Sequence, residues 1–300
     1  MMNKILKIFK NPFWVASVVL RRCSKLISDD ETFVGIEYFL GMKKVLNLKN
    51  PSTFNEKLQW LKLYGYKPEY SKLVDKAQVK DYIANVIGPE YIIPTIGIWD
   101  SFDDIDFDAL PDRFVIKTTH DSGGVVVCKD KIRLDISAAK RKINKSLKHN
   151  FYWEHREKVY KDIVPRIIAE KYIEDSRGEL KDYKFFCFNG QVKALFVASD
   201  RNDPKVETKF DFFDENFNLL PFTNGHPNSG YDIPKPKNFE KMKEIAALLS
   251  TGFPHLRVDL YDVDGDIYFG ELTFFHWSGN VPFKPEEWDY KFGEWLQLPN

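Results

Sequence analysis

The chain has 300 residues, with 44 Lys+Arg against 44 Asp+Glu, so its formal net charge at pH 7 is zero. This balance argues against bulk binding of nucleic acid, for which an excess of positive charge is typical. Hydrophobic residues make up 43% of the chain, enough to bury a large core in one unit or two lobes. Three cysteines, Cys23, Cys128 and Cys187, share no metal-binding spacing and predict reduced thiols in a cytoplasmic protein.

Residues 1–22 combine lysines with a short apolar run, NPFWVASVVL, that Arg21 and Arg22 follow. The run is shorter than the roughly 20 apolar residues that span a bilayer. Two interpretations stay open. The segment is either a basic amphipathic anchor, which would hold the protein at the inner face of the membrane, or a first helix packed on the body.

The next segment, residues 31–112, is predicted to be mainly helical. Residues 31–70 carry apolar side chains at helix-like intervals, broken by Gly65 and Pro68, and residues 52–56 form a capping-box sequence. A further helix is predicted over 74–86, followed by a strand over 91–99 and an acidic linker over 100–112.

The sequence FVIKTTHDSGGVVV at 114–127 predicts two strands joined by a Ser-Gly-Gly turn. Gly123 and Gly124 allow the backbone to approach an anion closely, and turn amides can converge on phosphate oxygens. Lys117 would supply a positive charge beside this turn. The alternative is a hairpin turn with no ligand.

The second half of the chain alternates irregularly between helices and strands. We expect helices over 136–149 and 239–249, a strand over 167–173, a hairpin over 182–198 that turns at Asn189-Gly190, and a proline-rich loop over 221–238. Two further strands are predicted over 255–263 and 267–275. This irregular order indicates an α+β fold rather than a doubly wound sheet.

The last hairpin carries paired acids. A two-residue turn at 264–265 would place Asp259 and Glu271 on opposite faces, whereas a three-residue turn would place them opposite each other and Arg257 opposite Thr273. Facing acids lie about 5 Å apart at Cβ and repel each other unless a cation such as Mg²⁺ bridges them. The alternative is an Arg257–Glu271 salt bridge with Asp259 solvated.

Six segments, in this order, together resemble the ATP-grasp superfamily and, within it, the branch similar to proteins of teichuronopeptide biosynthesis. They are LNLKNPSTFNEKLQWLKLY (46–64), VDKAQVKDYI (74–83), FVIKTTHDSGGVVVCKDK (114–131), VPRIIAEKYIED (164–175), DYKFFCFNG (182–190) and RVDLYDVDGDIYFGELTFF (257–275). The resemblance implies two α+β lobes that clamp ATP behind a helical N-terminal extension. The expected divisions are 1–30, 31–112 (acceptor side), 113–175 (phosphate loop) and 176–300 (Mg²⁺ site).

The resemblance also implies roles for individual residues. At the nucleotide they are Lys76 and Lys117 (phosphates), His120, Asp121, Ser122, Gly123 and Gly124 (the loop over the phosphates), Glu170, Lys171, Tyr172 and Ile173 (adenine, through the backbone) and Asp182 (ribose). At the reaction centre they are Asp259 and Glu271 as ligands of Mg²⁺, Thr273 where many relatives have Asn, Arg257 at the transferred phosphoryl group, and Lys184 or Arg201 at the γ-phosphate.

The implied activity is that of a carbon–nitrogen ligase using ATP and Mg²⁺. A substrate carboxylate would take the γ-phosphate to give an acylphosphate, and an amine would then displace phosphate. The branch implies a uronic-acid carboxylate of a cell-surface polysaccharide, such as a capsule or its precursor, and an amino acid or small amine. The alternatives are a glycosyltransferase of polysaccharide biosynthesis, a kinase-type phosphotransferase and a non-catalytic glycan-binding protein.

Overall fold

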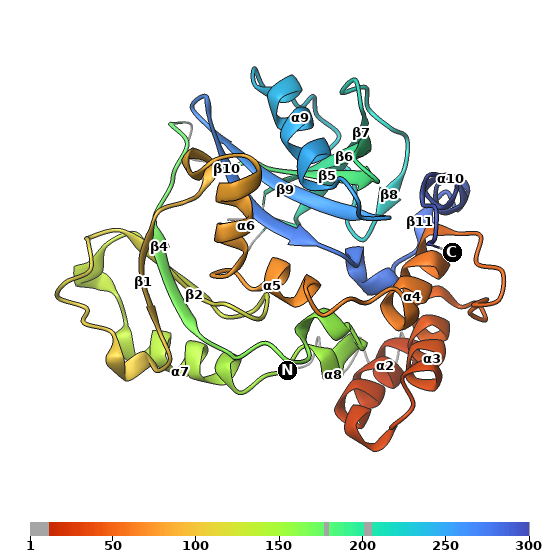
Figure 1. The fold of residues 1–300 in the computed structure, drawn as a ribbon, viewed down its shortest axis with the longest axis horizontal. Coiled ribbons are helices and arrows are strands. Elements are labelled where there is room, and N and C mark those ends of the chain that lie inside the picture. The colour runs from red at the N-terminus through yellow and green to blue at the C-terminus, as the bar shows by residue number, and fades with distance from the viewer. Residues whose placement is uncertain (1–11, 177–179, 201–205, 300) are drawn as a thin grey trace.

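The computed structural model describes residues 12–176, 180–200 and 206–299. Within these residues the strands form a four-stranded sheet in the order β1-β4-β2-β3 and a five-stranded sheet in the order β10-β9-β5-β6-β7 (Figure 1). All strand pairings in both sheets are antiparallel, and the helices lie around them, which confirms the α+β class. No helix in the described part is both long and apolar enough to cross a membrane.

Helices dominate the first part of the chain. They are α2 (Pro12–Arg22), α3 (Asp30–Met42), α4 (Phe54–Tyr64), α5 (Tyr70–Val74) and α6 (Val79–Val86). The predicted capping box is confirmed, because Thr53 and Glu56 each bond the other's backbone N–H at the start of α4. Residues 43–53 separate α3 from α4, so the helical stretch predicted over 31–70 is more divided than its apolar spacing suggests. Residues 12–22 form a helix that packs on α3 and α8.

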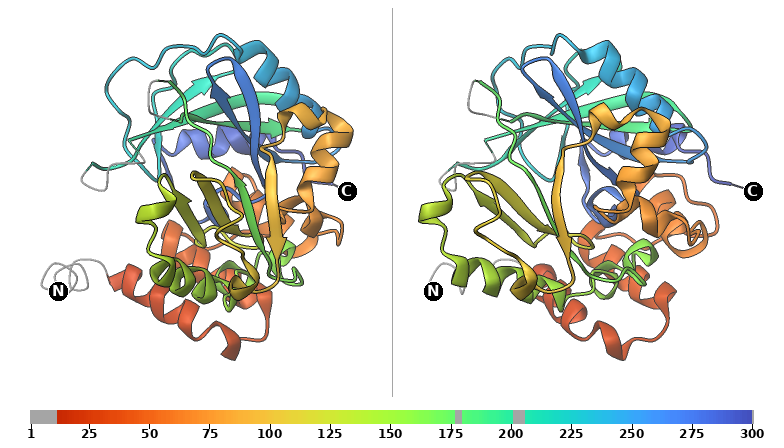
Figure 2. Two further views of the ribbon diagram at one scale, coloured as in Figure 1. Left: turned by 90° about the vertical axis from the view of Figure 1, so that its left-hand side faces the viewer. Right: turned by 60° about the vertical axis from the view of Figure 1, so that its left-hand side comes forward.

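The smaller sheet contains β1 (Thr95–Trp99), β2 (Phe114–Thr118), β3 (Val125–Cys128) and β4 (Ile167–Lys171). Helix α7 (Ile136–Leu147) covers one side of it, and the two share a core that includes Phe114, Ile116 and Ile143 (Figure 2). The strands predicted over 91–99 and 167–173 are shorter than expected. A short 3-10 turn takes Pro89–Tyr91, and β4 ends at Lys171.

The larger sheet contains β5 (Asp182–Phe188), β6 (Gln191–Ser199), β7 (Lys209–Asp214), β9 (Leu256–Val263) and β10 (Asp266–Thr273). Helix α9 (Phe239–Leu249) packs on one face through contacts such as Phe185 with Phe239. The other face carries Arg257, Asp259 and Lys184. The remaining elements are α8 (Tyr152–His155), α10 (Glu287–Trp295), β8 (Thr223–Asn224) and β11 (Phe283–Lys284).

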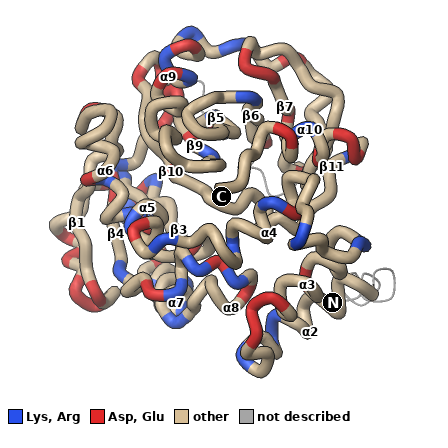
Figure 3. Tube along the Cα trace, turned by 45° about the vertical axis from the view of Figure 1, so that its right-hand side comes forward, with Lys and Arg blue, Asp and Glu red and all other residues tan. Residues whose placement is uncertain are grey.

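The balanced charge of the sequence is spread over the whole fold. Figure 3 shows basic and acidic residues interspersed along both sheets and the helices around them. The cysteines at positions 23, 128 and 187 are free thiols.

The last hairpin has the turn of one predicted alternative and the acid pairing of the other. Asp266 pairs with Val263, so the turn has two residues, Asp264 and Gly265. A β-bulge at Gly270 then shifts the register by one residue, and Glu271 comes to lie opposite Asp259. The predicted acid pair therefore forms, but a bulge aligns it rather than a three-residue turn.

Candidate active site

A cavity of about 270 Å³ lies between the two sheets. The small sheet and α6 contribute side chains to one wall, and β5, β9 and β10 form the other. Its charged and polar lining residues are Lys76, Lys80, Lys117, Ser122, Glu170, Asp182, Lys184 and Glu271. Four lysines beside three carboxylates make a site that suits an anionic ligand carrying its own cation.

Glu170 holds two of these lysines. Its carboxylate lies 2.6 Å from Lys117 Nζ and 2.5 Å from Lys80 Nζ. Burial alone would raise the pKa of Glu170, but the two ammonium groups lower it below its usual value. Because Glu170 lies in β4, between β1 and β2, its backbone is within the sheet and its side chain orients the lysines.

Lys80 is a site residue that the sequence analysis missed. Its ammonium group also donates to the backbone oxygen of Ile93 at 2.8 Å and to Thr95 Oγ1 at 2.7 Å. Burial lowers the pKa of Lys80, and Glu170 opposes that shift. The available signal was its spacing four residues after Lys76 in VDKAQVK, which suits two side chains on one side of a helical segment.

Lys76 lies just before α6 and is bound to the glycine-rich loop. Its ammonium group donates to the backbone oxygen of Asp121. The backbone N–H of Lys76 donates to the backbone oxygen of Thr119 at 3.0 Å. Burial lowers the pKa of Lys76, while nearby Glu271 and Asp121 act in the opposite direction. Asp75 accepts from the N–H groups of Ala77 and Gln78 and so fixes this turn.

Hydrogen bonds to the side chain of Asp121 hold the loop at 120–124. Asp121 accepts hydrogen bonds from the side chains of Thr118 and Ser146 and from the N–H of Gly124, and these bonds lower its pKa against the effect of burial. His120 is buried, with Nε2 2.9 Å from the backbone oxygen of His149. Ser122 lines the cavity, so these three neighbouring residues lie in different surroundings.

Asp259 is 1% exposed and is surrounded by cations. Arg257 binds both of its oxygens, Nε to Oδ1 at 2.7 Å and an outer nitrogen to Oδ2 at 2.8 Å, and Lys184 also donates to Oδ2. Lys184 lies 2.6 Å from Asp182 as well. Burial would raise the pKa of Asp259, but Arg257 and Lys184 hold it well below its usual value.

Glu271 faces the cavity with 46% of its side chain exposed. Arg257 donates to it at 3.0 Å and to Thr273 Oγ1 at 2.9 Å, so one guanidinium joins all three predicted metal-site residues. The Arg257–Glu271 salt bridge of the alternative prediction is present. Asp259, however, is buried rather than solvated.

Within the described residues, no group of three or more His, Cys, Asp or Glu side chains is placed to hold a metal ion. The acid pair nevertheless fits a hard cation that also binds a ligand. Glu271 points into the cavity, and the bonds described above leave Asp259 Oδ1 with a further lone pair. Mg²⁺ held here would depend on oxygens from the ligand, as it commonly does with phosphates.

A second pocket of about 300 Å³ adjoins the cavity and shares five lining residues with it, Ile93, Lys117, Val125, Glu170 and Tyr261. Its walls combine apolar side chains with the segment that leaves β4. The lining residues that are not shared include Val115, Val127, Lys171, Tyr172, Ile173 and Ala198. Apolar side chains beside a segment that has left the sheet suit an aromatic ring that is recognised by backbone groups.

The structure therefore brings most of the predicted residues to one pair of connected pockets. His120 and Gly124 belong instead to the support of the loop, and Asp259 and Arg257 lie behind the cavity wall. Arg201 lies outside the described residues, so the choice between it and Lys184 at the γ-phosphate stays a prediction.

The family model described as TupA-like ATPgrasp matches residues 56–297. Similar solved structures include an L-amino acid ligase from Bacillus licheniformis, with 14% identity and a TM-score of 0.47 over 91% of this chain and 57% of that one. A D-alanine–D-alanine ligase from Bacillus anthracis complexed with ATP has 17% identity and a TM-score of 0.40 over 68% of this chain and 55% of that one. A D-alanine–D-alanine ligase from Helicobacter pylori has 15% identity and a TM-score of 0.43 over 83% and 70%.

The chain thus spans little more than half the length of the first two of these structures. No match was found among the curated proteins. The family match covers most of the chain, from α4 to the residues that follow α10. The chain belongs to the TupA-like ATP-grasp family.

Proposed function

We propose that this protein is an ATP-dependent carboxylate–amine ligase. The observation that carries the proposal is the pair of adjoining pockets between the sheets. One combines apolar side chains with the segment after β4, and the other is lined by four lysines, with Glu271 in its wall and Asp259 behind that wall. Membership of an ATP-grasp family and the resemblance of six ordered segments support the same conclusion.

The nucleotide would lie across both pockets. Adenine fits the apolar pocket against Val115 and Ala198, with Tyr172 and Ile173 offering backbone groups. The phosphates would then reach Lys117, and the ribose would pass Asp182.

The reaction requires the enzyme to position charges rather than to supply a nucleophile. An oxygen of the acceptor carboxylate bonds to the γ-phosphorus. The bond from the γ-phosphorus to the oxygen that bridges the β- and γ-phosphates breaks at the same time, and ADP leaves. The amine nitrogen then bonds to the acyl carbon, phosphate leaves, and the amine loses a proton. None of the described residues that line the cavity is Cys or His, in keeping with direct transfer between substrates.

The charges lining the cavity would stabilise the transition state. Lys76, Lys117 and Lys184 would offset negative charge on the phosphates, and Ser122 would help to keep water from the acylphosphate. Mg²⁺, held by Glu271 and Asp259 together with ligand oxygens, would neutralise part of the same charge.

We propose that the carboxylate belongs to a uronic acid of a cell-surface polysaccharide or its precursor, and that the amine is an amino acid or small amine. The support is the resemblance to the teichuronopeptide branch. We further propose that the protein works in the cytoplasm at the inner face of the membrane. In α2, Trp14 and Val19 are exposed in the same helix as Arg21 and Arg22, a combination that suits an anionic bilayer surface.

The test is release of ADP and phosphate from ATP with Mg²⁺, over a matrix of uronic-acid glycans and amines, followed by mass spectrometry. We expect turnover only when both are present and a product that has lost one water. A phosphorylated product without an amine would indicate a kinase. Consumption of a nucleotide sugar with ATP untouched would indicate a glycosyltransferase. Lys117→Met should abolish turnover, with Lys142→Met on the exposed side of α7 as the matched control.

A further inference from the structure

A strained turn follows the strand that carries Glu271. In the segment His276–Gly279, three successive residues adopt left-handed backbone angles, with φ of 49° at Trp277, 54° at Ser278 and 66° at Gly279. Such angles cost about 1–2 kcal/mol for each residue other than glycine and persist only where the surroundings enforce them.

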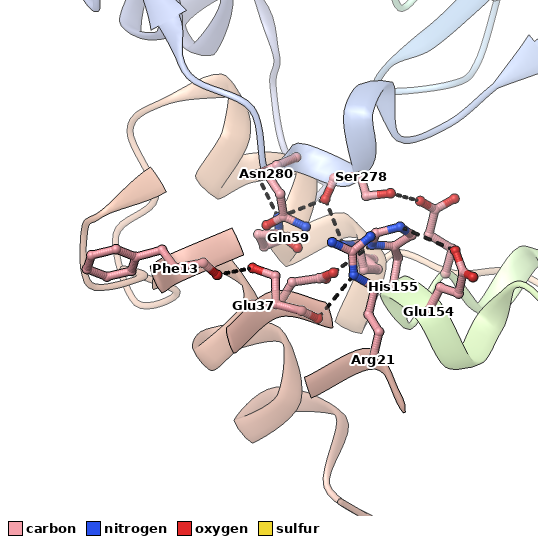
Figure 4. A network of polar contacts seen from close by, with 12 residues as sticks. Phe13, Arg21, Glu37, Gln59, Glu154, His155, Ser278 and Asn280 are labelled. Atoms are coloured by element: carbon pink, nitrogen blue, oxygen red, sulfur yellow. Dashed lines mark hydrogen bonds and ion pairs between the residues drawn. The ribbon is translucent and has the colours of Figure 1, made fainter. Parts of the chain in front are cut away.

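A buried polar cluster enforces this turn from below. The backbone oxygen of Ser278 accepts hydrogen bonds from Gln59 at 2.9 Å and from Lys62 at 2.8 Å, and Ser278 Oγ donates to Glu157 at 2.5 Å. Gln59 also donates to Asn280 Oδ1 at 3.1 Å. Figure 4 shows Gln59 of α4 beneath the turn, with its bonds to Ser278 and Asn280. Hydrogen bonds therefore fix both the backbone and the side chain of Ser278 in this turn.

The turn leaves Trp277 partly open to solvent, with 38% of the residue exposed. Phe210 of β7 stacks behind the indole, with ring centroids 6.0 Å apart and an interplanar angle of 24°. Gly225 lies directly against it, because a Cβ at that position would come within 2.7 Å of the indole nitrogen. The surroundings thus hold a large aromatic ring in place and leave part of it open to solvent.

This ring belongs to the same face of the large sheet as the reaction centre. Lys184 pairs with Phe196 across β5 and β6, and Phe196 pairs with Phe212 on β7, two residues after Phe210 on the same face. Strands lie about 4.8 Å apart and rise about 3.4 Å per residue, so Phe210 is about 12 Å from Lys184 along this face. His276, the residue before Trp277, contacts Arg257 at 3.0 Å. One sugar ring on the indole would span much of this distance.

We propose that Trp277 is the stacking platform for a pyranose ring of the acceptor glycan, with the carboxylate of that glycan directed along the sheet toward Arg257 and Lys184. This proposal rests on the ligase function proposed above and names the part of the molecule that binds its glycan. The negative face of an indole attracts the weakly positive C–H groups of a pyranose face. A ring held rigidly before binding loses little conformational freedom when the sugar arrives.

The experiment measures glycan binding without turnover. Oligosaccharides of glucuronic and galacturonic acid are titrated into ADP-saturated protein and followed by saturation-transfer NMR, with ADP affinity measured in parallel. We expect Trp277→Ala to weaken binding about tenfold or more, which corresponds to the loss of one stacked aromatic contact. Trp277→Tyr should recover most of the affinity, and Tyr64→Ala, at a 51% exposed aromatic residue of α4, should bind as the unchanged protein does.

Gly225→Ala provides a second variant, because its methyl group would displace the indole while leaving Trp277 in the chain. We expect it to weaken glycan binding with ADP affinity unchanged. Equal glycan binding by Trp277→Ala and the unchanged protein would overturn the platform and leave the ligase proposal standing. The platform would also be overturned if the unchanged protein bound none of these glycans while still joining another carboxylate to an amine. Because no turnover is needed, selective loss of binding in Trp277→Ala would support the platform even where ligase activity is not found.

Discussion

The structure assigns different energetic roles to the two acids that the sequence predicts as a pair. Asp259 is 1% exposed and binds Arg257 and Lys184, whereas the side chain of Glu271 is 46% exposed. Asp259→Asn leaves two buried cations without their carboxylate, a change that typically costs about 3–5 kcal/mol of unfolding free energy. Glu271→Gln removes one half-exposed partner and should cost less than about 1 kcal/mol.

Urea unfolding followed by circular dichroism measures the first difference, and ADP release at increasing Mg²⁺ measures activity. We expect both variants to lose most activity and Asp259→Asn alone to lose much of its stability. Because Glu271 faces the cavity directly, the loss in Glu271→Gln should be partly recovered at high Mg²⁺. Equal unfolding midpoints for Asp259→Asn and the unchanged protein would refute the charge cluster. Full activity in both variants would refute the metal site.

Two further predictions follow from the loop and from Glu170. In Gly124→Ala the new methyl group would lie closer than 3.0 Å to two buried hydroxyls. We expect this clash to lower the free energy of unfolding in urea by about 1–3 kcal/mol. Gly123→Ala is the control, because its nearest neighbour is 3.7 Å away and its stability should change little. The pKa of Glu170 is below its usual 4.5 in the folded protein, so its bonds to Lys117 and Lys80 stabilise the fold above that pH and are lost as the pH falls through the lowered pKa. Between pH 6 and pH 3, the free energy of unfolding should therefore fall less steeply with pH in Glu170→Gln than in the unchanged protein. The same pH dependence in both proteins would contradict a lowered pKa of Glu170.

Local sequence patterns predicted several elements because short-range chemistry decides them. The capping box at Thr53 and Glu56 needs only a hydroxyl and an acid three residues apart, and the hairpin at Asn189-Gly190 needs only residues that tolerate positive φ. The alternation of Arg257 and Asp259 with apolar residues likewise placed both on one face of β9. The ordered segments of the family resemblance then brought these pieces into one fold.

Contacts between distant segments could not be read in this way. Lys80 and Glu170 are 90 positions apart. They meet because Glu170 pairs with Thr95 across β4 and β1, and Lys80 of α6 also bonds Thr95. At the bulge the backbones of the two hairpin strands approach closely, because a Cβ on Gly270 would lie 3.0 Å from the backbone oxygen of Asp259 on β9. Hairpin alternation alone treats residue 270 as an ordinary strand position. A two-residue turn without the bulge therefore predicts a register that is wrong by one at Asp259 and Glu271, and the three-residue alternative gives the right pairing with the wrong turn.

The folded unit extends beyond the N-terminal boundary of the family match, because helix α3 contributes buried contacts to it. The match begins at residue 56, yet Glu37 of α3 is buried and lies 2.6 Å from His155 Nδ1. Burial would raise the pKa of Glu37, but His155 and Lys62 lower it, so an α3 acid helps to balance the buried lysine that holds Ser278. Buried polar groups are costly unless each finds a partner, so the geometry of the strained turn depends on a helix outside the matched region. Residues 30–42 are therefore part of the structure that supports the site, although the family pattern does not include them.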